Sequence, residues 1–155
     1  MASVSPTPTS KSAALGFPAV GEELSSCPRV VTEADIAMFS ALMGDWHPQH
    51  TNVEWAGTSR FGERIAHGLR VLSFAVGLLE LDRERVIARR RLREVVFKRP
   101  THIGETIRVD ALVESVRPVS ADCALVGLRW RVVNAREETV LRAGIDVLYR
   151  GSVGE

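Results

Sequence analysis

Hydrophobic and polar positions alternate with a period of two through most of the second half of the chain. In residues 106–114, isoleucine, valine and alanine take every second position, and charged or polar residues take most of the others. The same alternation continues through residues 124–132 and 139–149. This pattern indicates strands of a sheet with one buried face and one solvated face. Short connections at residues 118–122 and 134–138 predict antiparallel hairpins.

The segment before these strands has a different pattern. Residues 69–81, LRVLSFAVGLLEL, are apolar on nearly every side. They predict a helix from about Ala66 to Leu81 that is buried all round. Upstream, Thr32 with Asp35 three residues later predicts a capped helix that ends at Gly44. The remaining predicted elements are strands over residues 20–31 and 92–97 and a short helix over residues 53–58.

Length, composition and charge narrow the class of protein. We expect one domain over residues 19–150, preceded by a disordered tail over residues 1–18 that is rich in Ser, Thr, Pro and Ala. The net charge of +1 gives no reason to expect a nucleic-acid partner or a charged membrane surface. No apolar run approaches the length of a membrane span. Cys27 and Cys123 form no motif, which fits a reducing setting, and we expect a cytoplasmic protein.

The most informative chemistry lies in the segment GDWHPQH that follows the first helix. Pro48 has no N–H and disfavours α conformation at His47, so we expect a bent loop rather than a helical turn. On such a loop, Asp45 and His50 could hold one water between a carboxylate and an imidazole that transfers its proton. The structural alternative is a polar cap after Gly44 and a plain surface histidine.

A second candidate feature opens the apolar helix. The first backbone N–H groups of a helix have no intrahelical partner and carry partial positive charge. Because Gly68 has no side chain, a ligand carbonyl can approach this terminus closely. The site would then stabilise an enolate-like oxygen. Alternatively, Gly68 only allows close packing, and His67 is a core histidine with satisfied hydrogen bonds.

Two motifs resemble those of a known family. The pattern G-D-x-[N/H]-P-x-H, followed by F-G-x-x-I-A-H-G-[M/L], resembles the MaoC-like dehydratases, which include (R)-specific enoyl-CoA hydratases. The resemblance extends from about Gly21 to Tyr149. It implies an α+β hot-dog fold, in which a curved antiparallel sheet wraps around one long helix. It also implies catalytic roles for Asp45 and His50, with the Gly68 amide polarising a thioester carbonyl.

The resemblance further implies trans-2-enoyl thioester substrates, usually on CoA, and no metal or redox cofactor. This chain has His47 and Leu69 where the family more often has Asn and Met, which affects the expected loop geometry and pH dependence. No cysteine or further carboxylate stands at a metal-binding spacing from the histidines. The expected substrate-binding residues are His47, His67, Leu72 and Arg91.

Arg91 belongs to a basic cluster with Arg89, Arg90 and Arg93. Guanidinium groups match phosphate geometry, so the cluster could meet the phosphates of CoA or of a carrier-protein arm. The alternative is a solvated charge run that Glu94 partly neutralises.

The leading functional hypothesis is a hydratase/dehydratase that interconverts a 2-enoyl and a 3-hydroxyacyl thioester. Three alternatives remain: a dehydratase for carrier-protein thioesters, a thioesterase on the same fold, and a non-catalytic acyl-binding subunit. A thioesterase would place a carboxylate on or near the long helix, but Glu80 and Asp82 stand only at its far end. Because such a fold leaves a sheet edge uncovered, we expect a homodimer at least.

Overall fold

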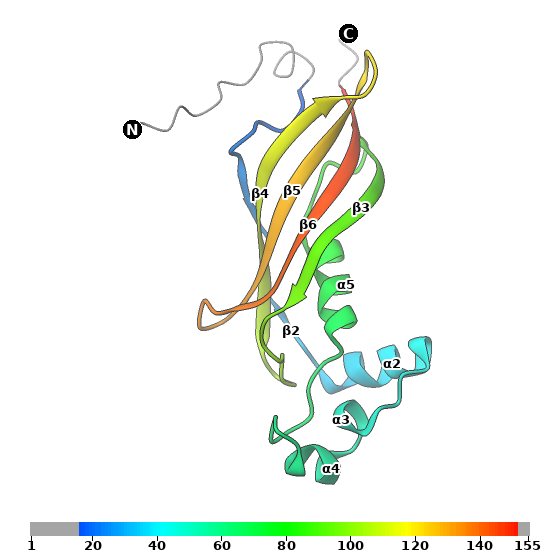
Figure 1. The fold of residues 1–155 in the computed structure, drawn as a ribbon, viewed down its shortest axis with the longest axis vertical. Helices are drawn as coiled ribbons and strands as arrows, with labels where there is room; N and C mark the ends of the chain where they lie inside the picture. The colour runs from blue at the N-terminus through cyan, green and yellow to red at the C-terminus, as the bar shows by residue number, and fades with distance from the viewer. Residues whose placement is uncertain (1–15, 152–155) are drawn as a thin grey trace.

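A strongly curved antiparallel sheet lies around one helix in the computed structural model, which describes residues 16–151 (Figure 1). Within these residues, six strands form one sheet in the order β1-β4-β5-β6-β3, and β2 also pairs with β4. The strands are β1 (Glu23–Ser25), β2 (Arg29–Val30), β3 (Val86–Phe97), β4 (Thr106–Pro118), β5 (Cys123–Asn134) and β6 (Thr139–Arg150). The helices are α2 (Glu33–Met43), α3 (Pro48–Thr51), α4 (Val53–Thr58) and α5 (Gly68–Leu78). The predicted α+β class is confirmed.

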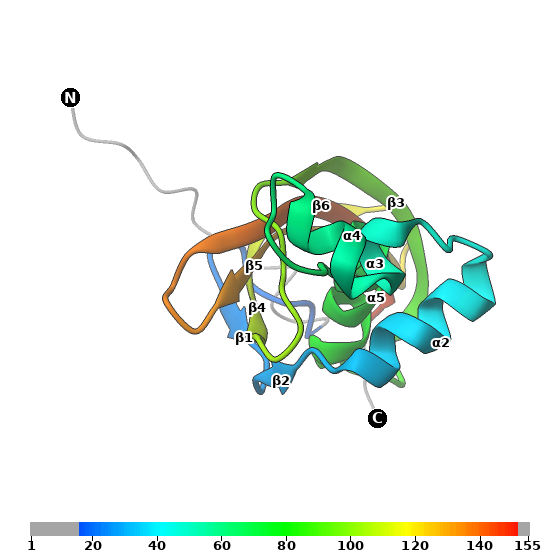
Figure 2. The same cartoon turned by 90° about the horizontal axis from the view of Figure 1, so that it is seen from below.

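The core fills the space between the sheet and α5, as the alternating pattern predicts. Figure 2 shows the curved sheet around α5, with α3 and α4 near one end of this helix. Most inward side chains of β4, β5 and β6 are buried, and α5 contributes its own buried face. This core includes Val109, Val113, Leu128, Trp130, Leu141 and Ile145 from the sheet and Val71, Leu72, Phe74 and Ala75 from α5. Burial of each large apolar side chain stabilises the fold by about 1.5–3 kcal/mol.

Helix α2 begins and ends where the sequence predicts. The Thr32 hydroxyl accepts a hydrogen bond from the backbone N–H of Asp35, and the Asp35 carboxylate accepts one from the backbone N–H of Thr32. This reciprocal pair satisfies two donors that the first turn of a helix leaves free. At the other end, Gly44 adopts a left-handed conformation with φ 73° and donates its N–H to the carbonyl of Ser40. Glycine adopts this conformation without strain.

The Asp35 carboxylate also ties α2 to its neighbours. It accepts hydrogen bonds from Arg29 at 2.9 Å and from Arg70 of α5 at 3.0 Å. Both guanidinium groups lie over the ring of Phe74, at 4.1 and 4.2 Å from its centroid. Burial of Asp35 acts to raise its pKa, but the hydrogen bonds from Thr32 and Arg70 and the charge of Arg29 outweigh this and lower the pKa to about 2.

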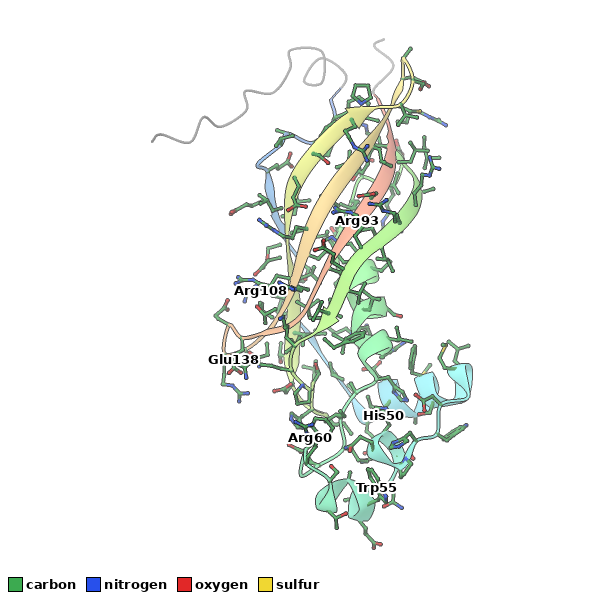
Figure 3. All side chains as sticks on the ribbon, in the orientation of Figure 1. His50, Trp55, Arg60, Arg93, Arg108 and Glu138 are labelled. Carbon is green, nitrogen blue, oxygen red and sulfur yellow. The ribbon has the colours of Figure 1, made fainter. Side chains whose placement is uncertain are left out.

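The outer face of the sheet carries a second buried carboxylate, Asp146 of β6, which is 6% exposed. Arg93 of β3 donates to it at 2.9 Å, and Arg91 lies 3.3 Å away (Figure 3). Gly144 beneath the Arg93 side chain leaves room for it. A Cβ atom added at Gly144 would lie 2.9 Å from the guanidinium carbon of Arg93, whereas one at Gly127 would meet the Ser115 hydroxyl at 2.5 Å.

Two predicted elements differ from the structure. The single strand expected over residues 20–31 is two short strands, because Pro28 has no N–H and the Ser26 hydroxyl accepts from the Val109 N–H between them. The long helix is shorter than predicted and is not buried all round. Leu69, Ser73 and Gly77, spaced four residues apart, are exposed on one face of α5.

The predicted tail over residues 1–18 stays a prediction. At its boundary, Phe17 packs against the core. Residues 1–15 of the predicted tail lie outside the described residues. Within residues 16–151, no helix has both the length and the apolar character needed to cross a lipid bilayer.

Replacement of Asp35 by asparagine tests how much this buried carboxylate stabilises the fold. A pKa lowered from 3.8 to about 2 corresponds to about 2 kcal/mol of stability, present at pH 7 and lost as the pH falls from about 4 toward 2. We expect urea denaturation to show that Asp35→Asn lowers the free energy of unfolding by about this amount at pH 7, with a smaller difference at pH 3. Glu33→Gln is the matched control, because its ion pair with Arg64 is exposed and should contribute under 1 kcal/mol. Equal effects of the two variants would contradict this account.

Candidate active site

Three ionisable side chains from separate segments meet at the N-terminal end of α5. Asp45 follows the α2 cap, His50 lies in α3, and His67 is the N-cap residue of α5. Each contributes one polar atom, and these atoms lie within 4.8 Å of one another. Figure 3 shows His50 at this end of the molecule, with Trp55 and Arg60. The sequence singled out all three residues, and the structure brings them together.

The backbone around His50 differs from the predicted bent loop. Residues 48–51 form one helical turn, α3, because proline is tolerated at the first position of a helix, where an N–H would have no intrahelical partner. His47 is the N-cap residue, and its Nδ1 accepts a hydrogen bond from the backbone N–H of Gln49 at 3.1 Å. The ring of His47 also meets Trp55 edge-on at 5.3 Å. His47 therefore ties the turn down through its own ring nitrogen.

The hydrogen bonds of His50 define its tautomer. Its Nδ1 lies 2.7 Å from the backbone carbonyl of Ile65. Because a carbonyl only accepts, Nδ1 carries the hydrogen, and the Nε2 of the neutral ring keeps its lone pair. This lone pair is available to accept a proton, as general-base chemistry requires.

His67 supports the other two residues from beneath. Its ring is 4% exposed and stacks on the His50 ring with centroids 3.7 Å apart. Its Nε2 lies 3.2 Å from the backbone carbonyl of Asp45, 3.3 Å from the Ser40 hydroxyl and 3.9 Å from the Asp45 carboxylate. Burial lowers the pKa of His67 below 6.5, although the Asp45 carbonyl and carboxylate act to raise it. His67 is therefore neutral at pH 7, with its hydrogen on Nε2.

The Asp45 carboxylate is the most exposed of the three groups, at 53%. One of its oxygens accepts from the backbone N–H of His47 at 3.2 Å. This bond holds the carboxylate beside the turn that carries His50 and leaves its other oxygen available for a water or a substrate atom.

The N-terminus of α5 lies beside this group. Its N-cap residue, His67, makes no side-chain capping bond, and within residues 16–151 the N–H groups of Gly68 and Leu69 have no acceptor. A Cβ atom at Gly68 would lie 2.7 Å from the ring of Phe97. Gly68 thus permits close packing, as the structural alternative holds, and also exposes a helix terminus suited to a developing negative charge.

A cleft of about 480 Å³ opens at this terminus. Its lining includes His50, Gly68, Leu69 and Phe97, with Lys98, Arg99 and Arg60 contributing positive charge. An uncharged acyl chain with a polarisable carbonyl fits such a mixture of apolar walls, free N–H groups and basic rim.

The other predicted binding residues lie elsewhere. Leu72 is buried in the core at 8% exposure, and Arg91 lies on β3, paired with Asp146. Their predicted contacts with substrate stay predictions. Sequence reasoning missed Ser40 and Phe97. The sequence shows Ser40 only as a polar residue four positions before the Gly44 cap. Its contact with His67 becomes visible only in the folded structure.

The same three residues invite comparison with a metal site, because each offers one ligand atom. An imidazole bonds a metal in the plane of its ring, but the His50 and His67 rings are stacked, with only 26° between their planes. Their lone pairs therefore do not converge on one point about 2 Å from both nitrogens. In addition, the hydrogen of His67 lies on the nitrogen that faces Asp45. The arrangement suits proton transfer better than metal binding.

Comparison with known proteins defines first the fold class and then the family. A Mycobacterium tuberculosis protein described as having a double hotdog fold matches with a TM-score of 0.80 over 92% of this chain and 45% of its own, at 20% identity. The chain therefore has the predicted hot-dog fold. The model of the MaoC like domain matches residues 17–128, and the chain belongs to this family.

Three further relatives place the chain within the family. An (R)-specific enoyl-CoA hydratase from Rhodospirillum rubrum is 30% identical over 122 residues, which cover 75% of this chain and 83% of the relative. A monoamine oxidase regulatory protein from Archaeoglobus fulgidus is 36% identical, with a TM-score of 0.83 over 90% of this chain and 95% of its own. Protein MaoC from Klebsiella aerogenes is 38% identical over 90 residues, but the match spans only 27% of its length.

The tautomers of the stacked histidines are directly measurable. We expect long-range ¹H–¹⁵N NMR spectra at pH 7 to show His50 with its hydrogen on Nδ1 and His67 with its hydrogen on Nε2, as their carbonyl partners require. Because burial lowers the pKa of His67, its signals should titrate below 6.5. His67→Asn and His50→Asn variants assign the two sets of signals. Titration of His67 above 6.5 would contradict the buried stack.

Proposed function

We propose that the chain is a hydratase/dehydratase that interconverts a trans-2-enoyl thioester and a 3-hydroxyacyl thioester. The observation that carries this proposal is the convergence of the Asp45 carboxylate and the His50 Nε2 lone pair beside the free N-terminus of α5. The names of the relatives agree, because one of them is an (R)-specific enoyl-CoA hydratase. The (R) configuration of the product comes from this kinship alone.

The proposed hydration step gives Asp45, His50 and the N-terminus of α5 each a separate role. A water held by Asp45 and His50 gives one proton to the Nε2 of His50 while its oxygen attacks C3 of the enoyl group. The electrons of the double bond move toward the thioester carbonyl, and the resulting oxyanion accepts hydrogen bonds from the N-terminus of α5 at Gly68. His50 then returns its proton to C2, which gives the 3-hydroxyacyl thioester. Asp45 accepts a hydrogen bond from the O–H that stays on the attacking oxygen and so fixes the direction of attack.

His67 and Ser40 act as positioning residues in this proposal. The stacked His67 ring fixes the plane of His50, and its Nε2–H holds the backbone carbonyl of Asp45. Its lowered pKa matters because a second cation next to His50 would oppose proton transfer to that ring. This role differs from the substrate contact that the sequence suggested for His67.

The thioesterase alternative has less support. Helix α5 carries no carboxylate along its length, and Glu80 stands beyond its last residue. The ionisable groups lie instead in α3 and in the segments that flank it. The non-catalytic alternative gives no reason for a neutral histidine to be packed beneath an ionisable pair.

Loss of enoyl absorbance on mixing with crotonyl-CoA is the direct test. We expect the wild type to hydrate this substrate and both Asp45→Asn and His50→Ala to lower kcat by about 10²-fold or more, as expected for removal of acid–base catalysis. Asp122→Asn, in the distant β4–β5 hairpin, is the matched control and should retain full activity. Release of free thiol in a colour assay would indicate a thioesterase. Turnover that is undiminished in both variants would contradict the proposed roles.

We also propose that the chain forms a homodimer through β3. This strand is one edge of the sheet, and Ile87, Leu92 and Phe97 on it are 43%, 46% and 49% exposed. Exposed edge strands with apolar side chains readily pair with another chain. We expect light scattering to give twice the monomer mass at micromolar concentration, and Leu92→Glu to weaken the dimer at least tenfold. Val119→Glu, an equally exposed apolar position in a hairpin, is the control. A wild-type monomer would contradict the proposed pairing.

A further inference from the structure

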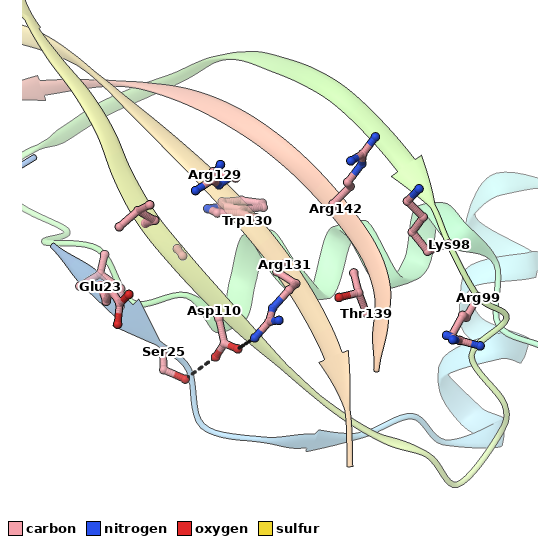
Figure 4. Close-up of a pocket in the computed structure, with 13 residues that line it drawn as sticks. Glu23, Ser25, Lys98, Arg99, Asp110, Arg129, Trp130, Arg131, Thr139 and Arg142 are labelled. Carbon is pink, nitrogen blue, oxygen red and sulfur yellow. Dashed lines mark hydrogen bonds and ion pairs between the residues drawn. The ribbon is translucent and has the colours of Figure 1, made fainter. Parts of the chain in front are cut away.

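Three basic side chains stand in a row on the outer face of the sheet, across three adjacent strands. In the pairing of β5 with β6, Arg131 lies directly opposite Arg142. In the pairing of β6 with β3, Arg142 lies opposite Val96, and the backbone N–H of Lys98 donates to the carbonyl of Val140. Because side chains alternate along a strand, Lys98 shares the face of Arg142 and lies diagonally beside it. Figure 4 shows this row.

The row has too few carboxylates to balance its charge. Like charges directly opposite each other destabilise a sheet. Arg131 lies 3.3 Å from Asp110, but within residues 16–151 no carboxylate lies within ion-pair distance of Arg142 or Lys98. Of the arginines that the sequence singled out, Arg91 and Arg93 both pair with Asp146. Among residues 16–151, no carboxylate lies within ion-pair distance of Arg89 or Arg90.

The surface around the row is hollowed and shares two lining residues with the cleft at Gly68. A depression of about 1190 Å³ includes five basic side chains in its lining, Lys98, Arg99, Arg129, Arg131 and Arg142, against the two acidic ones, Glu23 and Asp110. Lys98 and Arg99 also line the cleft at Gly68. A ligand with its acyl end at Gly68 would reach the row by passing these two shared residues.

We infer that the row of Arg131, Arg142 and Lys98 binds the phosphate groups of the nucleotide end of a CoA thioester. Guanidinium groups bind phosphate oxygens through paired N–H donors, and an unpaired cross-strand arginine is stabilised when an anion lies between it and its neighbour. The inference rests on the proposed function and narrows its substrate. The nucleotide end of CoA carries a diphosphate and a 3′-phosphate, whereas the arm of a carrier protein has a single phosphodiester. Three cations in a row match the former.

Direct binding tests the row independently of catalysis. We expect calorimetry to show that adenosine 3′,5′-bisphosphate binds the wild-type protein and that Arg142→Ala and Arg131→Ala each weaken this binding at least tenfold. Arg117→Ala, an exposed arginine at the end of β4 outside the depression, should leave the affinity unchanged. Inorganic phosphate is measured in parallel. If it binds as tightly as the bisphosphate, the row is a site for free phosphate and the inferred nucleotide subsite is overturned.

Kinetics with two substrates then link the row to the cleft. Crotonyl-CoA and crotonyl-pantetheine share the reacting group, but the second has no phosphate. We expect Arg142→Ala to raise KM for crotonyl-CoA at least tenfold, with kcat unchanged and no effect on crotonyl-pantetheine. Equal effects on both substrates, or no effect on either, would overturn the inference. If the wild type turns over neither substrate, the proposed function fails, and the binding measurement still decides whether the row is an anion site. Thermal melts of Arg142→Ala should match the wild type or rise, because a like-charge repulsion is removed.

Discussion

The Asp35 carboxylate is the constraint on which the candidate site depends. The groups that meet at the N-terminus of α5 come from segments that share no strand pairing, so the sheet alone does not place them. Asp35 caps α2, binds Arg29 at the end of β2 and binds Arg70 in the first turn of α5. A single buried charge thus orients α2 against α5. Because Asp45 directly follows the α2 cap, the contact of Asp35 with Arg70 also determines the position of Asp45.

The second level of organisation is the histidine stack. Within the described residues, His67 is both the residue that opens α5 and the ring that supports His50. The oxyanion-type terminus and the base are therefore fixed by one residue rather than by two independent loops. Ser40 and the Asp45 carbonyl complete the arrangement by defining which nitrogen of His67 carries hydrogen. Preorganisation of this kind leaves little rearrangement to be made when a substrate enters.

Local patterns and the family resemblance predicted much of this molecule from the sequence. Alternation located the long strands, the Thr32 and Asp35 pair located α2, and the two motifs identified Asp45, His50 and Gly68. The errors came where local rules have exceptions. Proline was taken to exclude a helical turn at residues 48–51, although it is well tolerated in the first turn.

The features that the sequence could not give depend on contacts between distant residues. Ser40 and His67 are 27 positions apart, and Arg93 and Asp146 are 53 apart. Nothing in the run of residues 89–93 distinguishes the arginines with a buried carboxylate partner from a free cluster. Which charges face each other on a sheet depends on the register of its strands. The register of β3 against β6 has three irregularities that no local sequence pattern predicted.

On the outer face of the sheet, the positions of Gly144, Arg93 and Asp146 depend on one another. A methyl group at Gly144 would require the Arg93 side chain to move, and Asp146 would then remain buried without its closest positive partner. Removal of Arg93 alone leaves Asp146 with the more exposed Arg91 as its remaining partner, and the loss of one partner of a buried charge is costly. A substitution at one of these three positions therefore requires changes at the others. In diverging relatives, we expect the glycine, the arginine and the aspartate to be kept or replaced as one set.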